Sequence, residues 1–282
     1  MEINKGKPKS KKVGLALGGG AVRGLAHIGV LAVLEREGIP IDMIAGTSVG
    51  AIIGALYALG KDTRQIRKIA LDLSKKNFTF WVDPVLPKTG LLKGRKFEAT
   101  LRSIIGNAEF GDLKIPFACV ATDIWSGEEV VIESGPVWEG IRASSSIPVL
   151  FSTAKREGRH LVDGGLVNPI PVNVLKKMGA DFIIAVNVIP SIGGSSTRWI
   201  CGRNSEEPKE PNIINIIMQA IYINSYALAK TSLEDADVVI YPQIAHIPSA
   251  DLHRAQECIL LGEQAAQDSI PEIKRLCLHL VD

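Results

Sequence analysis

Short apolar runs alternate with longer amphipathic stretches along this chain. The short runs predict strands at residues 13–17, 41–46, 116–122, 128–132, 159–162, 182–188 and 237–241. The amphipathic stretches predict helices at residues 24–37, 49–60, 63–75, 95–105, 137–144, 171–178 and 212–232. Strands that alternate with helices favour an α/β fold with a mainly parallel central sheet. The first two strands are so apolar that we expect helices on both faces of that sheet.

The sequence Gly46-Thr47-Ser48-Val49-Gly50 joins one predicted strand to the helix that follows it. A serine between two glycines, at a sharp turn from strand to helix, is typical of a nucleophile elbow. The turn is too tight for a β-carbon on both flanks, so glycine supplies the strained or crowded positions. The pattern therefore predicts that the hydroxyl of Ser48 is presented at the carboxyl end of a strand.

A glycine-rich loop, Gly18-Gly19-Gly20-Ala21-Val22-Arg23-Gly24, lies between the first strand and the first helix. Its unshielded amides and the helix N-terminus that follows favour an anion. Arg23 stands where a dinucleotide-binding fingerprint has its third glycine, and the Gly-Lys-Ser/Thr of a phosphate-binding loop is absent. The remaining anion is the oxyanion of an acyl-transfer intermediate, and the alternative is a purely structural glycine turn. Arg23 either supports this loop or attracts a phosphate head group.

The segment Leu161-Val162-Asp163-Gly164-Gly165 carries an aspartate at the end of a predicted strand. If the strands are parallel, Asp163 faces the same sheet edge as Ser48, where open α/β sheets bind their ligands. The alternative is an ordinary Asp-Gly turn.

Together these segments resemble the patatin-like phospholipase family. The resemblance continues through Arg142-Ala143-Ser144-Ser145-Ser146-Ile147-Pro148 and Asn168-Pro169-Ile170-Pro171-Val172, and it spans residues 13 to 190. It implies a three-layer α/β/α fold and a serine acyl hydrolase with a Ser-Asp dyad, without a catalytic histidine.

The resemblance also implies a role for each matching residue. Ser48 is the expected nucleophile, Asp163 the expected base, and Gly18, Gly19 and Gly20 the expected oxyanion hole. Partial burial would raise the pKa of the aspartate and make it a stronger base toward a hydroxyl. An ester leaving group is less demanding than an amine, so lipid esters suit such a dyad.

A histidine could still complete a triad, because His246, His253 and His279 follow Asp163 in the chain order of an α/β-hydrolase. Two observations argue against this alternative. Few strands precede Ser48, and none of these histidines follows a clear strand in a turn-rich setting. We expect His27 to be a half-buried structural residue that hydrogen-bonds to the backbone.

Composition excludes several other classes of function. The chain has 282 residues and a formal net charge of +2, too small to indicate nucleic-acid binding. Its scattered cysteines indicate neither a zinc site nor a disulfide framework, and Cys119 lies in a core-strand pattern. No metal or organic cofactor is expected. No apolar run predicts a membrane span, and the N-terminus lacks a signal peptide.

We expect a basic tail at residues 1–12, which is either solvated or attracted to anionic lipid head groups. A single domain is expected at residues 13–282, with a flexible surface loop at 190–211. The apolar side chains at residues 77–95 either cover the core or line an acyl channel. The apolar stripe of the helix near 213–233 is typical of core rather than of a membrane anchor.

These observations predict a cytoplasmic serine hydrolase that acts on lipid or membrane-surface substrates, and its peripheral association with a membrane stays open. An acyltransferase or thioesterase would use the same dyad. The alternative from another class is a non-catalytic regulator that binds a lipid or a protein.

Overall fold

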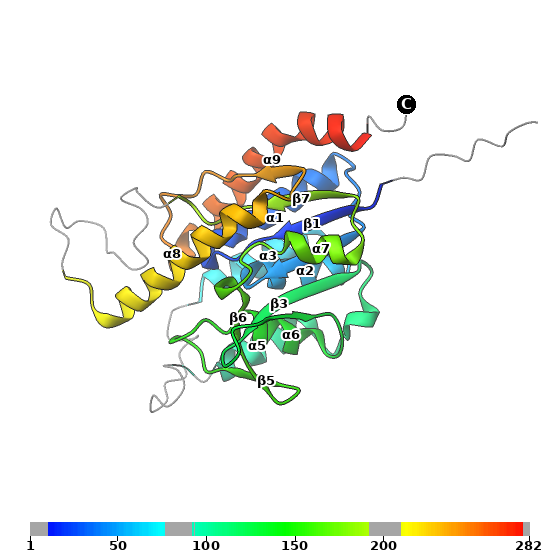
Figure 1. Cartoon of the computed structure of the whole chain (residues 1–282). Helices are drawn as coiled ribbons and strands as arrows, with labels where there is room; N and C mark the ends of the chain where they lie inside the picture. Colours follow the sequence, from blue (N-terminus) through cyan, green and yellow to red (C-terminus); the bar gives the residue numbers. More distant parts are fainter. Residues whose placement is uncertain (1–10, 77–91, 93, 192–209, 279–282) are drawn as a thin grey trace, which may run out of the picture.

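An eight-stranded sheet runs through the part of the chain that the computed structural model describes, residues 11–76, 92, 94–191 and 210–278. Its strand order is β5-β6-β3-β2-β1-β7-β8, with β4 paired to β3 (Figure 1). The predicted strands are confirmed with ends shifted by one or two residues, and β5 was not predicted. The strands are β1 (Val13–Leu17), β2 (Met43–Thr47), β3 (Phe117–Asp123), β4 (Glu129–Ile132), β5 (Ala154–Arg156), β6 (Arg159–Asp163), β7 (Phe182–Val186) and β8 (Val238–Ile240).

Helices cover both faces of the sheet, which confirms the predicted three-layer arrangement (Figure 1). Residues alternate between the two cores along β1: Leu15 and Leu17 pack on one side and Ala16 on the other. The core around Ala16 is closed by α7 and α8, and the larger core by the other helices. The helices are α1 (Ala26–Arg36), α2 (Val49–Ala58), α3 (Thr63–Ser74), α5 (Arg95–Ile105), α6 (Val137–Ser144), α7 (Val172–Met178), α8 (Ile213–Leu233) and α9 (Ala255–Leu278).

The long helix α9 was not predicted from the sequence, and it packs directly on α1. Their backbones touch through two glycines. A β-carbon on Gly29 would lie 2.0 Å from the carbonyl oxygen of Ile259, and one on Gly262 would lie 2.0 Å from that of Ala26. Glycine is therefore the residue that permits this approach.

The sheet departs from parallel pairing around β3. The strands β1, β2, β3, β7 and β8 pair in parallel, whereas β4 and β6 run antiparallel to β3. Thr47 of β2 pairs with Val120, and Asp163 of β6 pairs with the next residue, Ala121. Because β4 pairs along residues 119–122 of β3, β2 and β6 share the opposite edge of β3 and meet end to end.

Several predicted features lie outside the described residues. These are residues 1–10 of the basic tail, most of the apolar loop at 77–95, and residues 192–209 of the expected surface loop. Cys119 is fully buried in the core, as predicted. Among the helices of the described part, none combines the length and apolar character needed to cross a bilayer.

Candidate active site

Ser48 occupies a strained turn between β2 and α2. Its backbone has φ 56° and ψ −122°, a conformation that residues other than glycine rarely adopt. The flanking glycines are required by crowding. A β-carbon on Gly46 would lie 2.6 Å from the carbonyl oxygen of Gly50, and one on Gly50 would lie 2.1 Å from that of Leu17. The geometry matches the predicted elbow, with the serine rather than a glycine in the strained conformation.

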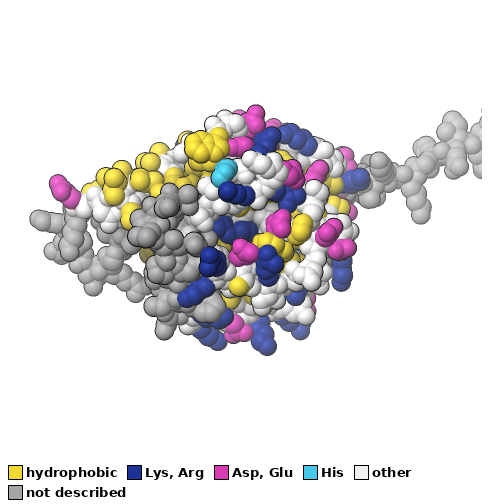
Figure 2. All heavy atoms as spheres, turned by 90° about the horizontal axis from the view of Figure 1, so that it is seen from below, with side chains coloured by type: hydrophobic (Ala, Val, Ile, Leu, Met, Phe, Trp, Pro, Cys, Tyr) yellow, Lys and Arg dark blue, Asp and Glu magenta, His cyan; other side chains and the backbone are white. Residues whose placement is uncertain are grey.

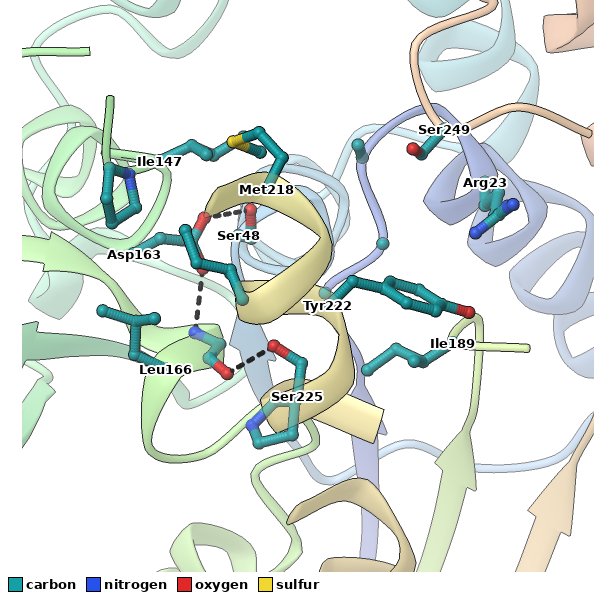
Figure 3. Close-up of a pocket in the computed structure, with 17 residues that line it drawn as sticks. Arg23, Ser48, Ile147, Asp163, Leu166, Ile189, Met218, Tyr222, Ser225 and Ser249 are labelled. Atoms are coloured by element: carbon teal, nitrogen blue, oxygen red, sulfur yellow. Dashed lines mark hydrogen bonds between the residues drawn. The ribbon is translucent and has the colours of Figure 1, made fainter. Parts of the chain in front are cut away.

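The hydroxyl of Ser48 donates a hydrogen bond to Oδ2 of Asp163 over 2.5 Å (Figure 3). The other carboxylate oxygen, Oδ1, accepts from the backbone N–H of Gly165 over 2.8 Å. Both side chains are nearly enclosed: Ser48 is 6% exposed and Asp163 is 8% exposed. Burial raises the pKa of Asp163 to about 6, against the opposing effect of the hydrogen bonds from Ser48 and Gly165.

Asp163 reaches Ser48 by a route that the sequence did not predict. The prediction that both residues face one sheet edge was made for parallel strands, and this condition does not hold because β6 is antiparallel to β3. The two residues meet because β2 and β6 approach each other head to head along one edge of β3. The carboxyl end of β6 therefore faces the carboxyl end of β2.

The C-terminal end of α6 and the residues that follow it hold both partners in place. Oγ of Ser144 accepts a hydrogen bond from the backbone N–H of Ser48 over 2.9 Å. The carbonyl oxygen of Ser146 accepts from the backbone N–H of Asp163 over 2.9 Å. Arg142 is buried beneath them and donates to Oγ of Ser146 and to the carbonyl oxygen of Ser152. Sequence analysis assigned no role to this segment, which here acts as a clamp on the two active-site turns.

The glycine-rich loop approaches Ser48, but two of its three predicted amides are already used. The N–H of Gly18 donates to the carbonyl oxygen of Val186 over 3.3 Å, and that of Gly19 donates to the carbonyl oxygen of Pro169 over 2.9 Å. The predicted oxyanion hole is therefore wrong for Gly18 and Gly19, because their donors hold the loop to the sheet. Gly20 lines the cavity beside Ser48, and its N–H has no acceptor within the described part of the chain.

His27 belongs to the support of this loop. Its Nε2 donates to the carbonyl oxygen of Gly18 over 2.7 Å, so the predicted backbone hydrogen bond is confirmed. The prediction of half-burial is wrong, because His27 is fully enclosed. Burial lowers its pKa to about 4 and keeps the ring neutral. His246 is paired with Glu257, neither His246 nor His253 lines the cavity, and His279 lies outside the described residues.

Arg23 belongs to the same loop and is 2% exposed. Its Nε donates to the carbonyl oxygen of Ile247 over 2.7 Å, and its guanidinium lies 5.8 Å from the ring centroid of Tyr222. Burial lowers its pKa from the ordinary arginine value. These contacts favour the interpretation of Arg23 as a support for the loop.

A cavity of about 80 Å³ opens over the hydroxyl of Ser48, and most of its lining is apolar. Part of its wall comes from α8, whose contribution the sequence did not indicate (Figure 3). Oγ of Ser225 donates to the carbonyl oxygen of Gly165 over 2.8 Å and ties this helix to the turn after Asp163. In the described residues, no group of three or more His, Cys, Asp or Glu side chains could hold a metal ion. The apolar lining comes from Ala21, Ile147, Pro148, Leu166, Pro169, Ile189, Met218, Ile221 and Tyr222.

Known proteins resemble this chain in sequence and in fold. The sequence matches the family described as "Patatin-like phospholipase" over residues 15–176. Lysophospholipase NTE1 of Meyerozyma guilliermondii is 32% identical over 90% of this chain, and that of Scheffersomyces stipitis is 33% identical over 90%. This chain spans 19% and 17% of the length of those relatives. The crystal structure of VipD from Legionella pneumophila shares the fold, with a TM-score of 0.55 at 14% identity, over 95% of this chain and 69% of VipD.

The clamp can be tested with two neighbouring serines. Ser144→Ala removes the acceptor of a buried N–H, so it should lower the free energy of unfolding by about 1–3 kcal/mol. Ser145→Ala is the matched control, since Oγ of Ser145 is buried without a hydrogen-bond partner in the described structure. Its loss should leave stability unchanged or slightly higher. Urea unfolding of both variants provides the measurement, and equal losses would contradict the role of Ser144.

The raised pKa of Asp163 predicts a pH-dependent cost in stability. A carboxyl whose pKa is about 6 in the folded state and 3.8 ordinarily binds its proton more tightly when folded. Stability should therefore fall as the pH rises through this interval, and the loss is complete above it. Asp163→Asn removes this ionisation, so its unfolding free energy should not fall over the same interval. The amount by which the variant is more stable than the wild type should therefore be about 2–3 kcal/mol larger at pH 8 than at pH 4.

Asp72→Asn, on the exposed surface of α3, is the control for this comparison. The difference between this variant and the wild type provides the baseline for the loss of an exposed carboxylate. A constant difference between Asp163→Asn and the wild type from pH 4 to pH 8 would show that Asp163 ionises normally.

Proposed function

The chain belongs to the patatin-like phospholipase family, and from this membership we propose that it is a serine acyl hydrolase of lipid carboxylic esters. Ser48 is the nucleophile and Asp163 the general base. The observation that carries this proposal is the 2.5 Å hydrogen bond between their side chains, in a strained and buried turn. The name of the relatives supports lysophospholipids as the first substrates to test.

In the first step, Oγ of Ser48 bonds to the ester carbonyl carbon while its proton passes to Oδ2 of Asp163. A carboxyl with a pKa of about 6 is ionised at neutral pH, and it is a stronger base than one with the ordinary value. The hydrogen bond already points the hydroxyl proton toward this base. No histidine is needed for the transfer.

The carbonyl oxygen becomes an oxyanion as the new bond forms. We assign its stabilisation to the N–H of Gly20, which lies at the cavity wall without another acceptor in the described part. The N-terminus of α2 begins directly after Ser48 and adds its partial positive charge. Preorganised donors of this kind lower a barrier strongly, since they need no rearrangement during the reaction.

The tetrahedral intermediate then collapses. The bond to the leaving alcohol breaks, and the alkoxide takes the proton from Asp163, which leaves an acyl group on Ser48. Asp163 next takes a proton from water as the water oxygen attacks the acyl carbon. The second collapse releases the fatty acid and returns the proton to Oγ of Ser48.

The surroundings of the dyad support a lipid substrate at a membrane surface. The cavity wall is mainly apolar, as an acyl chain requires.

We also propose a cytoplasmic location. The cysteines of the described part, Cys119, Cys258 and Cys277, are free thiols, which is usual in a reducing compartment.

A fluorophosphonate probe tests whether Ser48 is activated. Peptide mapping by mass spectrometry should find the label on Ser48. It should find none on Ser225 and Ser249, which line the same cavity and serve as internal controls. Ser48→Ala and Asp163→Asn should each lower the rate of lysophospholipid hydrolysis about a thousandfold or more. An unlabelled Ser48 would favour a non-catalytic regulator, and a labelled enzyme inert toward lipid esters would favour thioester or acyl-transfer chemistry.

The pH dependence of kcat/KM tests the identity of the base. With p-nitrophenyl butyrate as substrate, kcat/KM should rise with pH and level off above about pH 6, because Asp163 must be ionised to accept the proton. His246→Gln and His253→Gln should leave this acid limb in place. Loss of the limb in either histidine variant would assign the base to a histidine instead.

A further inference from the structure

The helix α8 carries apolar side chains on two opposite faces. Its inner face is buried and includes Met218 and Tyr222, which line the cavity over Ser48. Its outer face presents four isoleucines to solvent, and Ile213 is the most exposed of them at 73%. The outer residues recur every three or four positions, so they form one stripe along the helix. We define this outer stripe as Ile213, Ile216, Ile217, Ala220, Ile223 and Ala227.

The outer stripe carries no charge. No Asp, Glu, Lys or Arg occurs between Glu210 and Lys230. A helix face in contact with water is normally polar, and exposed apolar patches mark sites of interaction. Figure 1 shows the N-terminal half of α8 projecting beyond the sheet, and Figure 2 shows hydrophobic side chains in a row along this projection. The stripe is therefore placed to meet an apolar environment outside the molecule.

The position of the stripe relates it to the candidate active site. A cavity of about 80 Å³ is much smaller than the several hundred cubic ångströms that enclose a drug-sized ligand. It can hold the ester group and the nearest part of a lipid, so the remainder must lie outside the cavity. Because one face of α8 forms part of the cavity wall, a bilayer against the other face would bring its lipids to the rim.

We propose that the outer stripe of α8 docks on the surface of a phospholipid bilayer and inserts its isoleucines among the acyl chains. The helix then lies in the interface rather than spanning the membrane, as apolar helix faces of limited size do. Since the stripe is uncharged, docking depends on apolar contact and is insensitive to salt. The proposal rests on the proposed function for its choice of lipid as the partner, but docking itself can be measured without turnover.

The test uses the full chain with Ser48→Ala, so that hydrolysis does not alter the membrane. Sedimentation with phosphatidylcholine vesicles measures the partition coefficient in low and high NaCl. The double variant Ile213→Gln with Ile216→Gln should bind about tenfold more weakly or worse, because two apolar anchors are lost. Leu260→Gln is the matched control. Leu260 is 49% exposed on α9, outside the stripe, and its replacement should leave binding unchanged.

A second readout separates docking from catalysis. With Ser48 restored, the double variant should hydrolyse soluble p-nitrophenyl butyrate at the wild-type rate and lose activity toward vesicle-borne lipid. Vesicle binding without hydrolysis of any ester would overturn the proposed function and leave the docking surface standing.

Three results would overturn the docking proposal. Unchanged vesicle binding by the double variant would remove the role of the stripe. If light scattering showed a dimer for the wild type and a monomer for the double variant, the stripe would be assigned to a contact with a second copy of this chain. A large fall in the unfolding temperature of the double variant would assign the stripe to packing within the chain.

Discussion

The candidate site depends on the meeting of two strand ends along β3. Thr47 pairs with Val120 and Asp163 pairs with Ala121, so the last residues of β2 and β6 lie one step apart on the same strand edge. The turn after β6 then crosses β3 in backbone contact, since a β-carbon on Gly164 would lie 2.2 Å from the carbonyl oxygen of Val120. This junction brings together a hydroxyl and a carboxylate from distant parts of the chain.

The junction holds two groups in states that are unfavourable on their own. A non-glycine residue at positive φ costs about 1–3 kcal/mol, and burial of the Asp163 carboxylate opposes its charge. The surrounding hydrogen bonds fix both residues from several sides. Oγ1 of Thr122 donates to the carbonyl oxygen of Asp163 over 2.9 Å, and Ser144 and Ser146 hold the two backbone N–H groups. Local strain and a raised pKa therefore persist because the rest of the fold overdetermines these positions.

Features encoded by neighbouring residues could be predicted from the sequence, and those set by distant partners could not. The strand–turn–helix units are local, so their pattern predicted most of the strands and helices and the candidate residues Ser48 and Asp163. The hydrogen bonds of Gly18 and Gly19 go to Val186 and Pro169, far along the chain, and no local pattern reveals them. The antiparallel course of β6 likewise depends on β3. The sequence does carry a signal for α9, since its core residues recur at helical spacing: Ala255, Cys258, Ile259, Ala266, Ile270 and Ile273.

The same distinction explains the outcome for α8. Its apolar periodicity predicted a helix and a buried stripe, and both are present. The interpretation of its apolar residues as core is wrong for the outer stripe, because a hydrophobic pattern does not tell which apolar residues find a partner within the fold. Ser225 and Asn224 hydrogen-bond to the carbonyl oxygens of Gly165 and Leu166, over 2.8 Å each. The element with the exposed apolar face is thus attached to the turn that carries the Asp163 carboxylate, so surface and dyad are parts of one connected unit.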